Sequence, residues 1–348
     1  MSHSIRPTVR DVANAAGVSP MTVSRVLNRS PLVAPETADR VRAVMEQLGF
    51  RLNQSARNLR QGRSAAMIGL VLDDIANPFY ASLSRAVEEV ARRHGALLVV
   101  SSSGNDPDRE REVVTTLLDR GLDGLLMYPT PAEHSYLHDG LLEKRPLVLL
   151  GRRPRDVDTD TVAVDNVGAA MRAVLHLADH GHKRIGIIGY GQIALDGDDP
   201  TTDHRLGRIE GFKRGLAAVG LDYDESLVRL NCAGVTEAAA AVRSLMAQPD
   251  PPTALFTMNN RMTVGALRAL GAGLSGVAVV GFDDFELADI FDPPITVVTP
   301  DPMEMGRVAA ETLFARLHGD DSPVKRTIMG ITLIARGSGE LPPRPLSR

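Results

Sequence analysis

The chain has 348 residues, of which 43% are apolar and 24% charged, so it is long enough for two or three globular domains. No apolar run is long enough to cross a membrane, and the first residues, MSHSIRPTVRD, lack the apolar centre of a signal peptide. The only cysteine is Cys232, which excludes an internal disulfide and fits a reducing compartment. We therefore expect a cytoplasmic protein.

The net charge of −4 is unevenly distributed along the chain. Residues 1–63 contain ten arginines, no lysine and four acidic side chains, which gives them a net charge of +6. The remainder has a net charge of −10. A small basic segment attached to an acidic body indicates that the segment meets a polyanion. The helical pattern of this segment argues against the alternative, a solvated basic tail.

The first elements expected along the chain are two short helices in the stretch TVRDVANAAGVSPMTVSRVLN. Thr8 and Asp11 have the spacing of a capping box at the start of the first helix, and Gly17 supplies a tight turn. Ser19 can cap the second helix, and Pro20 suits its first position because no amide hydrogen is needed there.

A third helix is expected at 35–48, with Val41, Met45 and Leu48 on its inner face. Each of the three helices carries one apolar stripe and is too short to be stable alone. We therefore expect them to share one small core. The polar stretch NQSARNLRQG at 53–62 is typical of a linker, or of a short helix that orders only with help.

From about residue 67 the sequence alternates between apolar runs and amphipathic segments. The runs predict strands at 67–72, 96–101, 124–128, 147–151, 184–189, 254–258 and 277–282. The amphipathic segments predict helices at 79–94, 109–120, 166–180, 205–219, 236–247 and 262–270. This alternation is typical of parallel sheets covered on both faces. Two such sets predict two doubly wound lobes, with a ligand cleft beyond the carboxyl ends of their strands.

The helix–glycine–helix spacing is that of a helix-turn-helix. The residues DVANAAGVSPMTVSRVLN, followed by NQSARNL, resemble the signature of the lactose-repressor (LacI/GalR) family, and the resemblance continues to about residue 337. It implies an N-terminal all-α helix-turn-helix head with a hinge helix. It also implies an α/β body like that of periplasmic binding proteins, made of two doubly wound lobes, with a crossing back to the first lobe near 293–325.

The resemblance sets the expected domain boundaries. They are a DNA-binding domain at 1–51, a hinge at 52–63, an effector-binding and dimerisation body at 64–340 and a tail at 341–348. Within the body, lobe one is expected at about 64–164 and 296–325, and lobe two at about 165–295 and 326–340. The resemblance implies a transcriptional regulator, and specifically a repressor. It implies that the protein binds double-stranded DNA at a pseudo-palindromic operator as a homodimer or tetramer.

The resemblance also implies which residues contact DNA. They are Thr8, Ser19, Pro20, Met21, Thr22, Ser24, Arg25, Asn28, Asn53, Ala56 and Leu59. Arg25 has the planar fork that suits guanine, whereas Met21 can only contact a thymine methyl or read shape. The short polar side chains suit phosphate contacts, with helix capping as the alternative. In the family a hinge leucine enters the minor groove, and Leu59 matches it.

The same reasoning places an effector in the cleft. The expected contacts are Asn77, Phe79, Tyr80, Asp106, Arg152, Arg208, Asn260 and Asp283. Phe79 and Tyr80 could stack on a ring or instead pack in the core. Asp283 could instead cap a loop.

This chain departs from the family at three effector positions: Gly151 and Asn260 stand where an aspartate is usual, and Pro300 falls near a usual glutamine. Arg152 and Arg153 follow Gly151 and add positive charge. From the family we expect a sugar, sugar acid or sugar phosphate as effector. These departures favour an acidic or phosphorylated one.

No enzyme, cofactor or metal is expected. GIIGYG at 186–191 lacks the third glycine of a dinucleotide-binding loop, and the pair His180 and His182 lacks further metal ligands. No catalytic triad motif occurs. The alternatives are an NAD-dependent enzyme, which lacks its phosphate loop, and a solute-binding protein, which leaves the basic head unexplained.

Overall fold

The structure is a computed structural model in which residues 8–27, 30, 32–48, 66–137, 141–142, 145–190, 203–232 and 234–344 are described. The chain divides into two compact units, Met1–Ala65 and Ala66–Arg348, and each has a hydrophobic core of its own. In the described ranges no helix combines the length and apolar character needed to cross a membrane.

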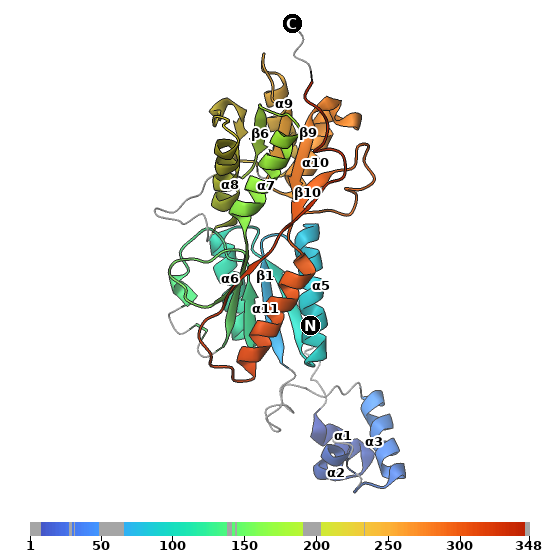
Figure 1. The fold of residues 1–348 in the computed structure, drawn as a ribbon. Coiled ribbons are helices and arrows are strands. Elements are labelled where there is room, and N and C mark those ends of the chain that lie inside the picture. The colour runs from blue at the N-terminus through green and yellow to red at the C-terminus, as the bar shows by residue number, and fades with distance from the viewer. Residues whose placement is uncertain are drawn as a thin grey trace. The chain divides into compact units, whose positions relative to one another are not determined.

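Three helices are described in the amino-terminal unit: α1 (Val9–Ala16), α2 (Pro20–Leu27) and α3 (Pro35–Gln47) (Figure 1). The capping box at the start of α1 is confirmed, since Thr8 Oγ1 accepts from the Asp11 amide at 3.3 Å and the Asp11 carboxylate accepts from the Thr8 amide at 2.7 Å. Gly17 ends α1 with φ 64°, a left-handed conformation that glycine adopts without strain.

The predicted three-helix core of this unit is confirmed. Val12, Val23 and Val41 are fully buried and contribute one side chain from each helix to a single cluster. Leu48, which we predicted to point inward, is 39% exposed. It follows the last residue of α3 as its carboxyl-terminal cap and is not part of the cluster that the three helices share.

The first sheet of the body has the strand order β11-β5-β4-β3-β1-β2, and all of its pairings are parallel. Its strands are β1 (Met67–Leu72), β2 (Leu97–Ser102), β3 (Gly124–Met127), β4 (Leu147–Leu150), β5 (Asp160–Val164) and β11 (Arg326–Met329). The alternation along β1 decides which helix covers which face. Leu70 packs in the cluster that contains α5 (Pro78–Arg93), whereas Val71 packs with α6 (Pro107–Asp119) on the other side.

The second sheet has the order β12-β10-β9-β8-β6-β7 and is parallel except for the pair β10–β12. Its strands are β6 (Ile185–Ile188), β7 (Val228–Arg229), β8 (Ala254–Thr257), β9 (Ala278–Phe282), β10 (Thr296–Thr299) and β12 (Thr332–Ile334). The helices associated with it are α7 (Asn166–Asp179), α8 (His204–Ala218), α9 (Val235–Met246) and α10 (Asn260–Leu270). Helix α7 packs on α8, and α9 packs on α10.

In the described part of the body, the chain crosses between the lobes after β5, after β10 and after β11 (Figure 1). After β10 it enters α11 (Pro302–Leu317), which packs beside α5 on the first sheet. The predicted crossings at 296 and 326 are therefore each about four residues early. Val297 and Val298 are fully buried in the second sheet, where β10 pairs with β9 and ends at Thr299. In the first sheet β11 pairs with β5 and ends at Met329.

Candidate functional site

The second helix of the head presents a polar outer face. Val23 and Val26 are buried, which turns Met21, Ser24 and Arg25 outward. Met21 is 64% exposed, a large apolar side chain that the small core leaves in solvent. Exposed apolar side chains beside an arginine suit a surface that contacts base edges.

The other predicted DNA contacts in the described part of the head lie at the start of α1 and at the start of α2. Thr8, Ser19 and Pro20 are exposed and Thr22 is half-buried. Ser19 Oγ accepts from the Thr22 amide at 3.1 Å and lies 2.9 Å from Thr22 Oγ1, so the expected capping role is present. Asn28, Asn53, Ala56 and Leu59 lie outside the described residues.

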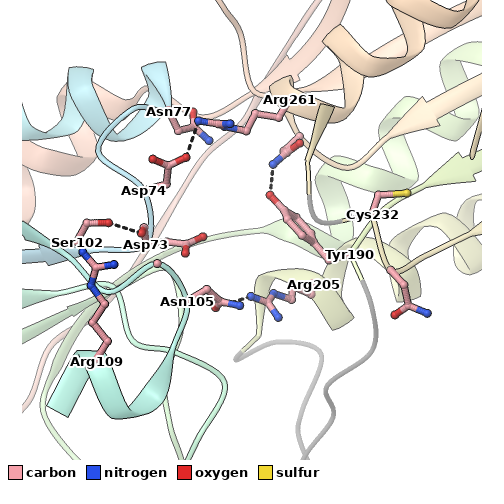
Figure 2. Close-up of a pocket in the computed structure, with 13 residues that line it drawn as sticks. Asp73, Asp74, Asn77, Ser102, Asn105, Arg109, Tyr190, Arg205, Cys232 and Arg261 are labelled. Atoms are coloured by element: carbon pink, nitrogen blue, oxygen red, sulfur yellow. Dashed lines mark hydrogen bonds and ion pairs between the residues drawn. The ribbon is translucent and has the colours of Figure 1, made fainter. Parts of the chain in front are cut away.

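A cavity of about 630 Å³ lies between the two lobes of the body, at the carboxyl ends of their strands (Figure 2). One side is lined by residues after β1, at and after the end of β2, and in the first turn of α6. The other side is lined by residues after β6, β7 and β8 and in the first turns of α8 and α10. The lining is Asp73, Asp74, Asn77, Ser102, Gly104, Asn105, Arg109, Tyr190, Arg205, Asn231, Cys232, Asn259 and Arg261. This is the edge at which doubly wound sheets bind ligands.

Polar contacts cross the cavity from one lobe to the other. Arg261 Nη2 lies 2.5 Å from the Asp74 carboxylate, and Arg205 Nη2 donates to Asn105 Oδ1 at 2.7 Å (Figure 2). Burial raises the pKa of Asp73, although the charges of nearby arginines, Arg205 first, act in the opposite direction. The cavity therefore combines a partly desolvated carboxylate with the buried guanidinium group of Arg205.

Two of the predicted effector contacts meet at the edge of this cavity. Asn77 lines it, and Asn260 Nδ2 donates to Asn77 Oδ1 at 2.8 Å across the two lobes. Asn77 Oδ1 also caps α5 by accepting from the Phe79 amide at 3.0 Å. Asn260 Oδ1 is buried and finds no hydrogen-bond partner among the described residues.

Arg208 and Asp283 lie together, and both are buried, at 6% exposure each. The Arg208 Nη1 atom lies 3.7 Å from the Asp283 carboxylate, and its guanidinium stacks 3.4 Å from the centre of the Phe282 ring. Nε donates to Asn166 Oδ1 at 3.0 Å, and Nη1 also donates to the Met258 carbonyl oxygen. Arg208 is thus committed to partners within lobe two, and it is not among the residues that line the cavity.

Arg152 is also paired within the protein. Its Nη2 lies 2.6 Å from the carboxylate of Asp203, and both side chains are buried, so the positive charge that the sequence adds here is neutralised. Asp203 caps α8 with its other carboxylate oxygen. Burial, together with Arg208 and other nearby arginines, lowers the pKa of the adjacent His204 well below its ordinary value, so its ring is neutral at pH 7.

Three further predicted contacts do not line the cavity. Tyr80 is 7% exposed and its ring meets that of Tyr128 edge-on at 5.2 Å, and Phe79 packs on Tyr80 at 5.4 Å. Both rings therefore pack in the core, which is the second of the two roles that the sequence left open for them. Asp106 is exposed and accepts from the amides of Asp108 and Arg109 as the cap of α6.

Several lining residues were not predicted as sites. Asp73 directly follows the buried strand β1, Asn105 follows β2 by a short turn, Tyr190 follows β6, and Arg261 begins the helix after β8. The sequence signal that could have identified these residues is their position just after a predicted strand, where parallel sheets bind ligands. Arg205 lies three residues before Arg208 on α8, and only the structure shows that it, rather than Arg208, faces the cavity.

Comparison with known proteins agrees with this architecture. Residues 8–53 match the family described as bacterial regulatory proteins, lacI family, and residues 174–339 match the periplasmic binding protein-like domain. The HTH-type transcriptional regulator PtxS of Pseudomonas aeruginosa is 33% identical, with 96% of each chain covered. The HTH-type transcriptional repressor CytR of Escherichia coli is 28% identical, covering 95% of this chain and 96% of its own.

Among solved structures, the complex of the transcriptional regulator CelR with cellobiose superposes with a TM-score of 0.68 at 30% identity. The match covers 96% of this chain and 100% of that one, so it spans the head as well as both lobes. Sequence and fold therefore agree. The chain belongs to the LacI family of bacterial transcriptional regulators.

Proposed function

We propose that this protein is a transcriptional repressor that binds a pseudo-palindromic operator in double-stranded DNA as a homodimer and is controlled by a small metabolite. The observation that carries the proposal is the outer face of α2, where Met21, Ser24 and Arg25 project from a helix whose inner face is buried. A dimer of such heads reads two half-sites related by the twofold axis of the protein. CytR, a relative over nearly the full length, is named a repressor.

The residues of the head divide into two roles in this proposal. Arg25 donates both arms of its fork to a guanine, and Met21 contacts a thymine methyl. Ser19 and Ser24 bind phosphates and fix the register of the helix on the duplex. Leu59, which lies outside the described residues, is proposed as the wedge that enters the minor groove at the operator centre.

The cavity between the lobes is proposed as the effector site. A ligand there contacts residues from both lobes and competes with or reinforces the contacts Arg261–Asp74, Arg205–Asn105 and Asn260–Asn77 that cross between them. Ligand binding therefore changes the preferred pose of the lobes. Since the same protein binds DNA, the two binding free energies are linked. CelR, the relative solved with cellobiose, supports a polyhydroxylated ligand.

The test is a fluorescence-anisotropy titration of the full-length protein on DNA from upstream of its own gene and on random DNA of equal length. We expect a clear preference for the upstream DNA, and a loss of affinity with rising salt for both. Arg25→Ala should abolish the preference. Arg42→Ala is the matched control, because Arg42 is exposed on α3, pairs with Asp39, and carries the same charge in the same unit.

Arg42→Ala should keep the preference for upstream DNA while weakening both affinities by the loss of one positive charge. An Arg25→Ala variant that still discriminates as well as the parent protein would remove the base-reading role. No preference for any genomic fragment over random DNA would remove the proposed function itself.

A further inference from the structure

Arg205 is the buried arginine of the cavity lining, and one of its donor atoms finds no hydrogen-bond partner among the described residues. Arg205 is 6% exposed and lines the cavity from α8. Its Nη2 atom donates to Asn105 Oδ1 at 2.7 Å, and its guanidinium lies 5.3 Å from the centre of the Tyr190 ring. Its Nε atom is buried and finds no hydrogen-bond partner among the described residues. A desolvated donor on a permanent charge is costly unless a bound group satisfies it.

Among the described residues, no ion pair joins Arg205 to a carboxylate, although its charge acts on Asp73 and opposes the rise in the pKa of that group. Three arginines and two aspartates line the cavity and give its lining a net charge of +1. Arg261 is half-buried and pairs with Asp74 at 2.5 Å, although its own Nε finds no hydrogen-bond partner among the described residues, and Arg109 is exposed in the first turn of α6. Asp73 is the remaining carboxylate of the lining, and no ion pair joins it to Arg205 among the described contacts. In Figure 2 the two side chains approach the centre of the cavity from opposite sides.

The two arginines that sequence reasoning chose as effector contacts differ from Arg205, because each lies beside a buried carboxylate and outside the cavity lining. Arg152 pairs with Asp203 at 2.6 Å, and Arg208 is held by Asn166, Met258 and Asp283. Neither lines the cavity. A ligand therefore meets Arg205 as its buried cation, and meets Asp73 and the amide side chains Asn105 and Asn259 as partners for hydroxyl groups.

We propose that Arg205 is the specificity-determining residue of the effector site and that the effector is a polyhydroxylated compound with one anionic group, a carboxylate or a phosphate. The anionic group accepts from Arg205 Nε and its fork, in the bidentate manner that guanidinium groups favour. The hydroxyl end of the ligand donates to Asp73. This inference rests on the proposed effector site and adds the chemical class of the ligand.

The test is isothermal titration calorimetry of the full-length protein, without DNA, against sets of matched compounds. Each set contains a neutral sugar, its aldonic acid and its phosphate: glucose, gluconate and glucose 6-phosphate; galactose, galactonate and galactose 1-phosphate; ribose, ribonate and ribose 5-phosphate. Inorganic phosphate is titrated alone. We expect at least one anionic compound to bind at least about tenfold more tightly than its neutral parent, the factor that one charged hydrogen bond supplies. Comparison of the aldonic acid with the phosphate of the same sugar then decides whether the anionic group is a carboxylate or a phosphate.

The tightest anionic compound is then titrated into three variants, with substitutions at two positions of the same helix. Arg205→Gln should weaken its binding at least about tenfold, and should weaken binding of the neutral parent by a smaller factor. Arg214→Gln is the matched control, because Arg214 is exposed and pairs with Glu210 on the surface of α8. It should bind as the parent protein does. Arg205→Lys, which keeps the charge and loses the fork, should lie between them.

Far-ultraviolet circular dichroism of each variant checks that it folds. The proposal is overturned if no anionic compound binds, if a neutral sugar binds as tightly as its acid and phosphate, or if Arg205→Gln and Arg205→Lys both bind the anion like the parent protein. Anisotropy on operator DNA separates this result from the proposed function. If a neutral sugar changes the affinity for operator DNA, only the inference about an anionic ligand is refuted. If an anion binds and leaves the affinity for DNA unchanged, only the proposed regulation is refuted.

Discussion

Removing Arg208 should destabilise the body through the charge that it leaves behind. In Arg208→Met the aliphatic stem is retained, but Asp283 loses the guanidinium that lies 3.7 Å from it. Both side chains are less than a tenth exposed. Deleting one partner of a buried ion pair costs about 3–5 kcal/mol. We expect the free energy of unfolding at pH 8 to fall by about that amount.

The loss should depend on pH with a definite sign. Burial raises the pKa of Asp283, and the charge of Arg208 opposes this, so the pKa rises further when Arg208 is removed. A carboxyl whose pKa is higher in the folded state adds stability when protonated, and this is lost as pH rises through the folded value. The destabilisation by Arg208→Met should therefore be smaller at mildly acidic pH than at pH 8.

Urea unfolding followed by far-ultraviolet circular dichroism measures both effects, since the chain has no tryptophan. Arg208→Met with Asp283→Asn should be more stable at pH 8 than Arg208→Met alone, because no buried charge remains unpaired. Asparagine also tolerates the positive φ of 64° at this position. If Arg208→Met loses the same stability at both pH values and the second substitution recovers none, the two side chains are not coupled.

Three other substitutions test the head, the helix packing and the crossover. Val23→Ala removes a fully buried side chain from the head core and should cost about 2 kcal/mol, measured as lost DNA binding with ligand binding by the body retained. Gly211→Ala would place a Cβ 2.2 Å from the Val167 carbonyl oxygen, so α7 and α8 must separate and the melting temperature should fall by several degrees. Asp160→Asn weakens the contacts of Asp160 with Arg316 at 2.7 and 2.8 Å and should cost about 2 kcal/mol at pH 7. Burial raises the pKa of Asp160, but the hydrogen bonds from Arg316 and from the Lys325 amide outweigh this and hold the pKa below 3.8. The difference in unfolding free energy between Asp160→Asn and the parent protein should therefore disappear as the pH falls below that value and Asp160 becomes protonated.

Much of the fold could be predicted because its signals are local. The seven predicted strands are present, as are the capping box at Thr8 and the turn at Gly17. Strands β5 and β10 were not predicted individually, since DTVAV and TVVT are short runs that contain threonine. Pairing with a neighbouring strand, which the sequence does not display, makes them strands.

The site was less accessible to sequence reasoning because partners come from distant parts of the chain. Arg152 and Arg208 have the residue type expected of ligand contacts, but Asp203 and Asp283 already satisfy them. Asp106 follows a strand, as a ligand contact should, and is a helix cap. Asn77 was predicted and does line the cavity. Its position at the start of α5 is fixed by local capping, which sequence reasoning can recognise.

The three crossings between the lobes have a consequence for how the body responds to cleavage. A protease that cuts once between β10 and α11 produces two fragments, and each fragment supplies strands to both sheets. Neither lobe is released as a separate piece, because β11 and β12 of the carboxyl-terminal fragment remain hydrogen-bonded to β5 and β10 of the other. The nicked protein should therefore elute as one particle in gel filtration and come apart only in denaturant.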